Sequence, residues 1–292
     1  MSEIPQTERV DAATAGLDLL QPAALVDALI GSQRGAFDAV AAAREAIAAA
    51  VDEIARRLES GGRLHYFGAG TSGRIAMLDA AEIPPTFGAE PSLVQAHIAG
   101  GETALVRAVE GAEDDAAAGR AAAREIGAGD AAIGISASGT AAYVIGAIEE
   151  ARARGAYTIA IVNGDSSALG AAADRSVVLS TGAEALAGST RLRAGTAQKI
   201  ALNTISTAVM VRLGKVYDNL MVDLVATNRK LRARALRLVV ALTGKAEPQA
   251  SALLDAAAGS VKCAVVMGRR NVDAREAHRL LERCQGRLRD AL

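Results

Sequence analysis

The feature that most constrains the fold of this chain is a glycine-rich loop, which lies between a short apolar run and a helical pattern. Residues 64–67 predict a buried strand, and the loop behind them carries three glycines and two hydroxyls: Gly68, Gly70, Thr71, Ser72 and Gly73. A helix-compatible stretch then ends on one carboxylate, Glu82, two residues before the first of two adjacent prolines. Free backbone N–H groups and the helix dipole converge where a strand, a glycine loop and a helix meet, so the segment predicts an anion site. The carboxylate at its far end suggests chemistry in addition to binding.

Short aliphatic runs alternate with helical patterns through the middle of the chain. We expect strands at 64–67, 93–98, 131–135, 157–162 and 176–179. This alternation predicts βαβ units and an α/β fold with a doubly wound, mainly parallel sheet. The principal helices are expected at 32–58, 74–81, 141–152, 194–213 and 225–242.

Changes of pattern divide the chain into three expected parts. Residues 1–60 form an N-terminal arm and helix, and residues 61–244 hold the sheet with the helices that follow it. Residues 245–292 form a small helical C-terminal domain. The second boundary follows from Thr243-Gly244, because glycine commonly ends a helix.

The composition excludes several classes of function. Hydrophobic residues make up 51% of the chain and aromatic residues only 2%, so aliphatic side chains must fill the core. A net charge of -1 gives no basic field for nucleic acid or an anionic membrane. Neither a signal peptide nor an apolar run of spanning length stands out, so we expect a cytoplasmic protein. The three histidines lack metal-ligand spacing, and the two cysteines, Cys263 and Cys284, are expected to be reduced.

A second hydroxyl-rich loop follows the expected strand at 131–135 and carries Ser136, Ser138, Gly139 and Thr140. Loops at the carboxyl ends of parallel strands share one crevice, so the two loops are expected to meet there. The spacing of Gly68, Gly70 and Gly73 also fits a dinucleotide fingerprint, but the acidic residue that would hold the ribose is missing. Together the loops favour a phosphate ester; the alternative is that their residues only turn the chain.

Several segments, in order along nearly the whole chain, resemble the N-acetylmuramic acid 6-phosphate etherase family: residues 68–74, 81–88, 109–114, 188–199, 213–223 and 226–228. The resemblance implies a sugar isomerase (SIS) domain of flavodoxin-like topology, a homodimer, and no metal or cofactor. It implies cleavage of the D-lactyl ether of N-acetylmuramic acid 6-phosphate to N-acetylglucosamine 6-phosphate and D-lactate, in cell-wall sugar recycling. Longer relatives include the glucokinase regulatory protein, which binds sugar phosphates without cleaving them.

The chemistry of that reaction calls for two carboxyl groups. An ether at C3 leaves poorly, but opening the sugar ring creates an aldehyde at C1 that acidifies the C2 proton. Elimination then needs a base at C2 and an acid at the lactate oxygen, and the conjugate base of that acid can activate water for the addition step. Two carboxyl groups suffice when their surroundings keep one protonated and the other ionised.

The resemblance assigns these roles residue by residue. Glu82 matches the family's acid, and Glu113 matches the second glutamate, the implied C2 base. Glu110 lies three residues earlier and could share a helical face, but the resemblance favours Glu113. Glu184 resembles the acid–base glutamate of SIS-domain isomerases and is a candidate for ring opening or substrate contact. The implied substrate and phosphate contacts are Gly70, Thr71, Ser72, Gly73, Ser136, Ser138, Gly139, Thr140 and Ser189.

The second loop departs from the family pattern. Residues 137–142 read Ala-Ser-Gly-Thr-Ala-Ala where the family has Ala-Ser-Gly-Arg-Thr-Pro. This departure leaves open a non-catalytic regulator that binds sugar phosphates on the same domain, although the retained Glu82 and Glu113 favour the etherase. A nucleotide-dependent oxidoreductase is a third interpretation, which the missing ribose acid disfavours.

Overall fold

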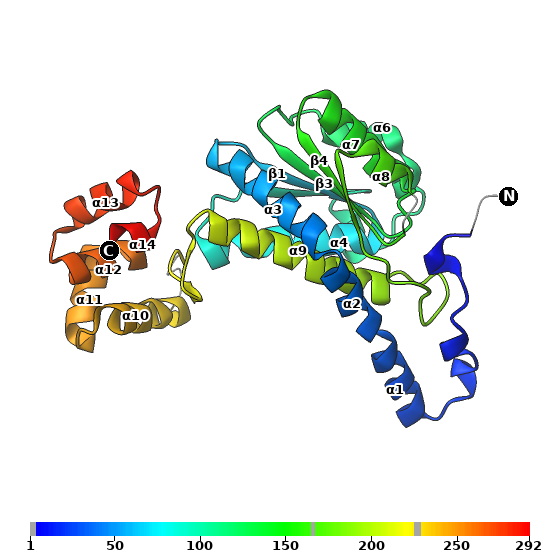
Figure 1. The fold of residues 1–292 in the computed structure, drawn as a ribbon, viewed down its shortest axis with the longest axis horizontal. Coiled ribbons are helices and arrows are strands. Elements are labelled where there is room, and N and C mark those ends of the chain that lie inside the picture. The colour runs from blue at the N-terminus through cyan, green and yellow to red at the C-terminus, as the bar shows by residue number, and fades with distance from the viewer. Residues whose placement is uncertain (1–3, 165–166, 225–228) are drawn as a thin grey trace. The chain divides into compact units, whose positions relative to one another are not determined.

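The computed structural model describes residues 4–164, 167–224 and 229–292 (Figure 1). Internal contacts divide the chain into two compact units. The first comprises residues 1–81 and 92–206, and the second comprises residues 82–91 and 207–292. Residues 225–228, where the last expected helix of the middle part begins, lie outside the described residues, as do residues 165 and 166.

The first unit is built on a five-stranded sheet. Its strands are β1 (Leu64–Gly68), β2 (Val94–Ile98), β3 (Ala131–Ser136), β4 (Tyr157–Val162) and β5 (Arg175–Val178). All neighbouring strands are parallel, in the order β2-β1-β3-β4-β5, which confirms the doubly wound parallel sheet. The direction of winding reverses between β1 and β3, and in such sheets ligands bind beyond the carboxyl ends of the strands at this switch point.

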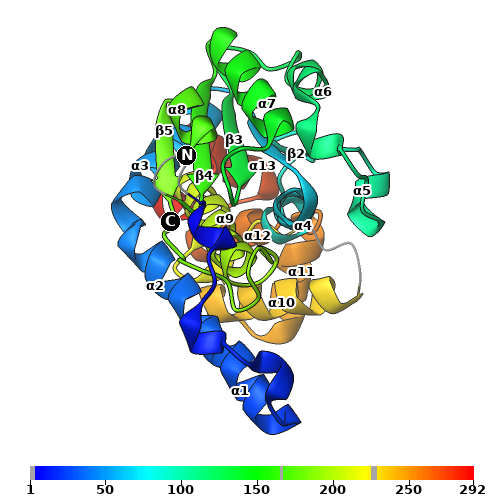
Figure 2. The ribbon, with the colours of Figure 1, turned by 90° about the vertical axis from the view of Figure 1, so that its right-hand side faces the viewer.

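Helices cover both faces of the sheet (Figures 1 and 2). One face carries α6 (Ala116–Ala122), α7 (Ala142–Ala153) and α8 (Ala168–Ala172). The other carries α3 (Arg44–Glu59), α4 (Gly70–Phe87) and α9 (Arg193–Arg212). Small side chains such as Ala132, Ala147 and Ala160 are fully buried against the first layer, so helix and sheet pack closely with few aromatic rings.

The N-terminal segment consists of short helical turns followed by longer helices. The turns are η1 (Gln6–Glu8), η2 (Ala12–Thr14) and η3 (Leu17–Leu19), and the helices are α1 (Pro22–Ser32), α2 (Arg34–Ala42) and α3. The single helix expected at 32–58 is therefore broken, at Ala43. Two further short elements, α5 (Thr103–Val106) and η4 (Ala112–Asp114), follow β2.

Helix α4 is longer than the sequence pattern indicates. It begins at Gly70, four residues before the expected start, and the N–H of Gly73 donates to the Ala69 carbonyl at 3.2 Å. The hydroxyls of Thr71 and Ser72 thus belong to the first helical turn. This places them at the helix N-terminus, where the dipole favours an anion.

The same helix also continues through Pro84 and Pro85 to Phe87. Proline lacks an N–H, so the carbonyls of Ala80 and Ala81 lose their usual helical donors. Ile83 and Phe87, four residues apart, are both buried. Burial of these two apolar side chains offsets the lost hydrogen bonds. The helix therefore extends beyond residue 81, where the sequence pattern predicted its end.

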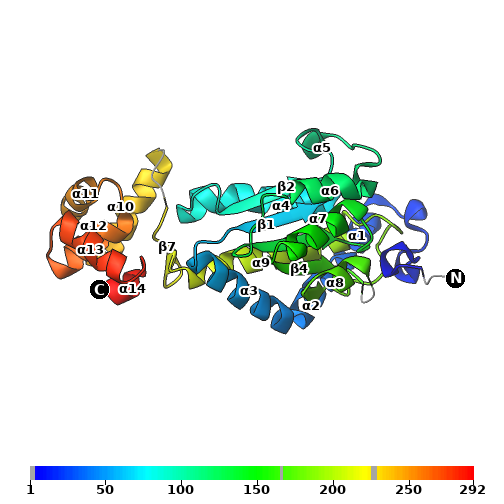
Figure 3. The same ribbon diagram turned by 90° about the horizontal axis from the view of Figure 1, so that it is seen from above.

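The second unit is mainly helical (Figure 3). A small antiparallel pair, β6 (Val216–Tyr217) and β7 (Leu220–Met221), precedes its helices. These are α10 (Arg229–Thr243), α11 (Glu247–Ala256), α12 (Val261–Arg270), α13 (Ala274–Arg283) and α14 (Leu288–Ala291). Residues 261–267 of α12 are all buried, so this helix forms the centre of the unit's core. The expected boundary near residue 244 coincides with the end of α10, inside this unit.

Among the described residues, no single helix has the length and apolar character needed to cross a membrane. The bent pair of α11 and α12 reaches that length and composition together, with a break of 117° between them.

A buried histidine pair lies between β1 and β2. The Nδ1 of His65 is 3.3 Å from the Nε2 of His97, and the two rings are stacked. His65 is only 3% exposed. Burial, together with the positive charge that His97 can carry, lowers the pKa of His65 to about 4, although Asp130 opposes this effect. Burial also lowers the pKa of His97.

This pair predicts a loss of stability in mild acid. Between pH 6.5 and about 4 the unfolded chain binds more protons than the folded chain, so stability is complete above pH 6.5 and falls as the pH drops. We expect His65 to contribute about 2 kcal/mol less at pH 5 than at pH 7.5. Urea unfolding of the wild type and of His65→Gln at both pH values measures this difference. An equal loss of stability in the two proteins would contradict the prediction.

Candidate active site

A cavity of about 260 Å³ opens at the switch point between β1 and β3. Its lining combines the start of α4, the end of β3 with the loop behind it, and segments from elsewhere in the first unit. Six of the predicted site residues lie in this lining: Gly70, Thr71, Ser72, Glu113, Ser136 and Ser138. The two hydroxyl-rich loops therefore meet as the parallel topology requires.

The start of α4 supplies backbone donors to this cavity. The first N–H groups of a helix have no acceptor within it, and in α4 these belong to Gly70, Thr71 and Ser72. Gly73 lies outside the lining, and its role is steric: a Cβ there would come within 2.6 Å of Ile98 Cγ1 and 2.9 Å of the Gly68 carbonyl oxygen. Glycine at this position lets the helix start directly above the sheet.

The second loop is held by hydrogen bonds within itself. Ser136 Oγ accepts the N–H of Gly139 at 3.1 Å, and the hydroxyls of Ser138 and Thr140 are 2.8 Å apart. Ser136 and Ser138 line the cavity, whereas Gly139 and Thr140 do not. Gly139 and Thr140 thus shape the turn that presents the two serines.

Glu113 reaches the cavity from η4, and its segment is anchored on both sides. Upstream, the Arg74 side chain donates to the carbonyls of Leu105 and Arg107, both at 3.2 Å. Downstream, Asp115 caps α6 by accepting the N–H of Ala118. Glu113 itself is exposed, so its carboxylate can face both solvent and ligand. Glu110, the alternative glutamate in this segment, is not part of the lining.

Seven lining residues were not among the predicted site residues. Four of them, Ala69, Ile135, Ala137 and Ala141, lie in or beside the two predicted loops, and the other three, Glu8, Gly188 and Thr190, come from distant segments. The N–H of Gly188 donates to the carbonyl of Thr7 at 2.9 Å, which brings the N-terminal arm to the cavity. A Cβ on Gly188 would lie 2.8 Å from Glu8 Oε2, and its φ of +78° is the left-handed region. Thr190 follows two residues after Gly188 and also lines the cavity. The N-terminal arm and the segment around Gly188 are far apart in the sequence, and no sequence pattern predicts that they lie side by side.

Comparison with known proteins agrees with this geometry. Residues 46–152 match the family model of the glucokinase regulatory protein N-terminal SIS domain, and residues 106–208 match the SIS domain model. The solved structure of a phosphoheptose isomerase from Francisella tularensis aligns with a TM-score of 0.50 at 21% identity, covering 66% of this chain and 100% of that one. This structural similarity supports the assignment of the α/β fold.

Full-length relatives are much closer in sequence. N-acetylmuramic acid 6-phosphate etherase from Deinococcus radiodurans is 51% identical, over 100% of this chain and 96% of its own. The protein of the same name from Streptomyces avermitilis is 48% identical, over 98% and 93%. This chain belongs to the N-acetylmuramic acid 6-phosphate etherase family. The resemblance inferred from its motifs is thereby confirmed.

Glu82, the expected acid, is not part of the cavity lining. Glu82 is exposed on α4, twelve residues after Gly70, which corresponds to about 18 Å of helical rise. One turn earlier, Asp79 is 3% exposed and accepts hydrogen bonds from the hydroxyls of Tyr66 and Ser206, both at 2.9 Å. The amide of Asn203 donates to it as well. These hydrogen bonds of Asp79 connect α4 to β1 and α9.

Glu184 and Ser189 are also absent from the lining. Glu184 is 1% exposed, and its two oxygens accept the N–H groups of Arg193 and Ala194, each at 2.8 Å. It therefore caps the start of α9, where its negative charge also matches the helix dipole. The N–H of Ser189 donates to the Leu186 carbonyl. Their expected contact with substrate stays a prediction.

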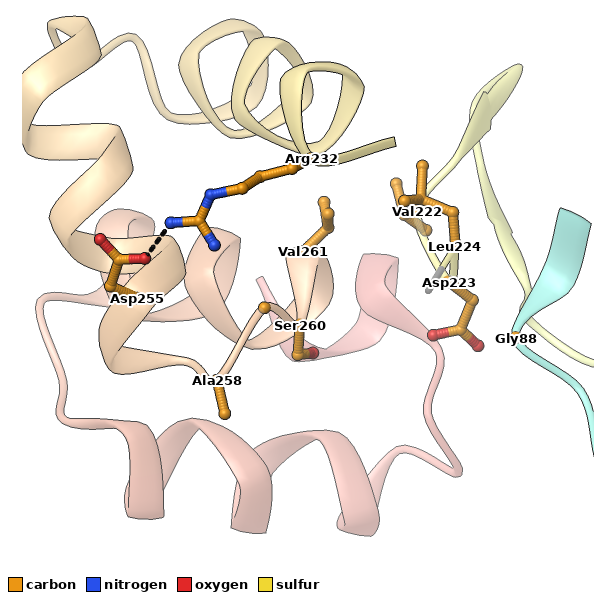
Figure 4. Close-up of a pocket in the computed structure, with 10 residues that line it drawn as sticks. Gly88, Val222, Asp223, Leu224, Arg232, Asp255, Ala258, Ser260 and Val261 are labelled. Carbon is orange, nitrogen blue, oxygen red and sulfur yellow. Dashed lines mark hydrogen bonds and ion pairs between the residues drawn. The ribbon is translucent and has the colours of Figure 1, made fainter. Parts of the chain in front are cut away.

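The second unit contains a larger cavity of about 520 Å³ (Figure 4). Its charged groups are paired: Arg232 bonds to Asp255, as the dashed line shows, and Asp223 lies 2.8 Å from Lys262 and 3.0 Å from Lys215. None of the residues predicted to bind or cleave the sugar lines it. The cavity at the switch point is therefore the candidate active site for this member of the etherase family.

Proposed function

We propose that this chain is a lyase that cleaves the D-lactyl ether of N-acetylmuramic acid 6-phosphate, giving N-acetylglucosamine 6-phosphate and D-lactate. The observation that carries the proposal is the cavity at the switch point, which joins both hydroxyl-rich loops with Glu113. Relatives that are about half identical over nearly the full chain bear the name of this activity. We place the reaction in the cytoplasm, in the recycling of cell-wall sugars.

Neutral donors bind the phosphate in this proposal. The charged residues in the described lining are both acidic, Glu8 and Glu113, so they repel a phosphate that lies near them. The N–H groups at the start of α4 and the hydroxyl of Ser136 form the part of the site suited to an anion. The phosphate binds there, and the sugar extends toward the carboxylates.

Glu113 acts as the base at C2. Once the ring has opened, its carboxylate removes the C2 proton, and the electron pair passes to the C1 carbonyl. Collapse of this enolate forms the C2–C3 double bond and breaks the bond between C3 and the lactyl oxygen. Water then adds at C3, and a proton returns to C2, which balances the overall hydrolysis.

Glu82 protonates the departing lactate and then activates water, and we propose that it comes from a second copy of the chain. It lies about 15–18 Å along α4 from the N–H groups proposed to hold the phosphate, farther than a hexose phosphate extends. Leu78, one turn before Glu82 on α4, is 50% exposed, as expected of a side chain that a second copy covers. A homodimer would therefore complete each site with a glutamate from the other subunit.

Replacing the proposed acid tests the reaction itself. Glu82→Gln should lower D-lactate release from N-acetylmuramic acid 6-phosphate by about a hundredfold or more, because general acid catalysis contributes about 10²–10⁴-fold. Binding of N-acetylglucosamine 6-phosphate should change less than threefold. Glu90→Gln, at an exposed glutamate nearby in sequence, is the matched control. Full lactate release by Glu82→Gln would show that Glu82 is not the general acid. If the wild type releases no lactate, the proposed function itself is wrong.

Hydrogen exchange at C2 tests the proposed base. In D2O the wild type should introduce deuterium at C2 of the product, and Glu113→Gln should slow this exchange by about a hundredfold or more. NMR of the product measures the deuterium content. Glu110→Gln should exchange normally, because that side chain lies outside the lining. Undiminished exchange in Glu113→Gln would exclude it as the base.

Complementation tests whether the two glutamates come from different subunits. When Glu82→Gln and Glu113→Gln chains are co-expressed, half of the dimers are mixed and one of the two sites in each mixed dimer keeps both glutamates. Lactate release should then return to about one quarter of the wild-type rate. If both glutamates act from the same chain, every site carries one lesion and activity stays at the level of the single variants.

A further inference from the structure

The N-terminal arm brings to the cavity a carboxylate that the mechanism above does not use. Glu8 belongs to η1, is exposed, and lines the cavity. Among the described residues, no hydrogen bond or ion pair involves its carboxylate. Both oxygens are therefore available to a bound ligand.

Main-chain contacts hold Glu8 at the cavity. The N–H of Gly188 donates to the carbonyl of Thr7 at 2.9 Å, and Thr7 is buried, so the residue directly before Glu8 is fixed. Oε2 of Glu8 lies 2.8 Å from the position that a Cβ on Gly188 would occupy, so the carboxylate packs against the backbone of this glycine. Neither contact depends on the charge of Glu8. An amide in place of the carboxylate can therefore occupy the same position.

Glu8 and Glu113 reach the cavity from different parts of the first unit. Figure 2 shows the dark blue N-terminal turns and α5, which precedes the Glu113 segment, on opposite sides of α4. A sugar bound in the cavity can meet both carboxylates, because both line it. The C1 hydroxyl and the C2 hydrogen lie on neighbouring carbons of that sugar. Two carboxylates can thus serve two separate proton transfers on one ligand.

Ring opening is the proton transfer that still lacks a group in the proposed reaction. Glu113 is assigned to C2 and Glu82 to the lactyl oxygen. Glu184, the earlier candidate for ring opening, is 1% exposed, and its two oxygens already accept the N–H groups of Arg193 and Ala194. Turning it toward a substrate would leave two N–H donors at the start of α9 without an acceptor, which is costly. Glu8 has no such commitment.

We propose that Glu8 is a catalytic residue that opens the sugar ring. Its carboxylate removes the proton of the C1 hydroxyl, and the electron pair of that O–H bond forms the C1 carbonyl. The bond between C1 and the ring oxygen breaks, and the carboxyl group returns its proton to that oxygen, which becomes the C5 hydroxyl. Glu8 is ionised again at the end, so no co-reactant is needed. This role rests on the proposed function, because it supplies the aldehyde on which Glu113 acts.

Exchange between anomers tests ring opening without the elimination. The α and β anomers of N-acetylglucosamine 6-phosphate interconvert through the open chain, and saturation-transfer NMR of their anomeric protons measures the rate. The wild type should accelerate this exchange above the rate without enzyme. At saturating sugar phosphate, Glu8→Gln should lower the catalysed rate by about a hundredfold or more, because general acid–base catalysis is lost. In Glu113→Gln, deuterium exchange at C2 should be slowed more than the exchange of anomers.

Two further variants control this experiment. Asp18→Asn, at an exposed acid in the same arm, should exchange anomers at the wild-type rate. Glu8→Asp keeps a carboxylate on a shorter side chain and should recover part of the rate that Glu8→Gln loses. Calorimetry with N-acetylglucosamine 6-phosphate shows whether Glu8→Gln still binds, and its affinity should change less than threefold.

The outcomes separate this role of Glu8 from the proposed function. If the wild type releases D-lactate but does not accelerate the exchange of anomers, the proposed function stands and the role of Glu8 is wrong. If Glu8→Gln loses affinity for the sugar phosphate but reaches the wild-type rate at saturation, Glu8 only binds the sugar and is not catalytic. If the wild type neither releases lactate nor exchanges anomers, the proposed function is wrong and the role of Glu8 fails with it.

Discussion

Backbone N–H groups at the first turn of α4 converge on the switch point of the sheet, and the rest of the site depends on that convergence. The groups lie there because β1 ends beside β3 and because Gly68 and Gly73 allow the helix to start in direct contact with the sheet. The reversal of strand order brings the loop behind β3 to the same place. Glu113 lines the same cavity.

The sequence predicted those parts of the site that depend on interactions between residues close together in the chain. Aliphatic runs of strand length indicated the five parallel strands, and glycines with hydroxyls behind two of them indicated the loops of the cavity. Contacts between distant segments could not be predicted in this way. Glu8 reaches the cavity only because the backbone near Thr7 pairs with Gly188, and the burial of Glu184 depends on its position beside the start of α9. The extension of α4 past its prolines likewise follows from the burial of Ile83 and Phe87.

Buried polar clusters connect the elements that carry the site. Asp79 binds donors from β1 and α9, and so fixes the helix on which Glu82 lies. Ser72, Gln198 and Asn163 connect the same helix to α9 and to the end of β4. In a core made largely of small aliphatic side chains, such directional bonds supply the specificity that close packing of larger side chains supplies elsewhere.

The first turn of α4 has a consequence for how this family can vary. A site built from main-chain N–H groups and a helix dipole depends on the path of the backbone and little on the identity of the exposed side chains. Residues 140–142 carry neither the arginine nor the proline expected from the family resemblance, yet the turn around Ser136 closes through its own hydrogen bonds. In the proposed site the main chain carries phosphate recognition, which tolerates such differences in side chains. Natural variation is therefore expected to concentrate in the side chains around the anion, while the glycines that set the backbone path remain.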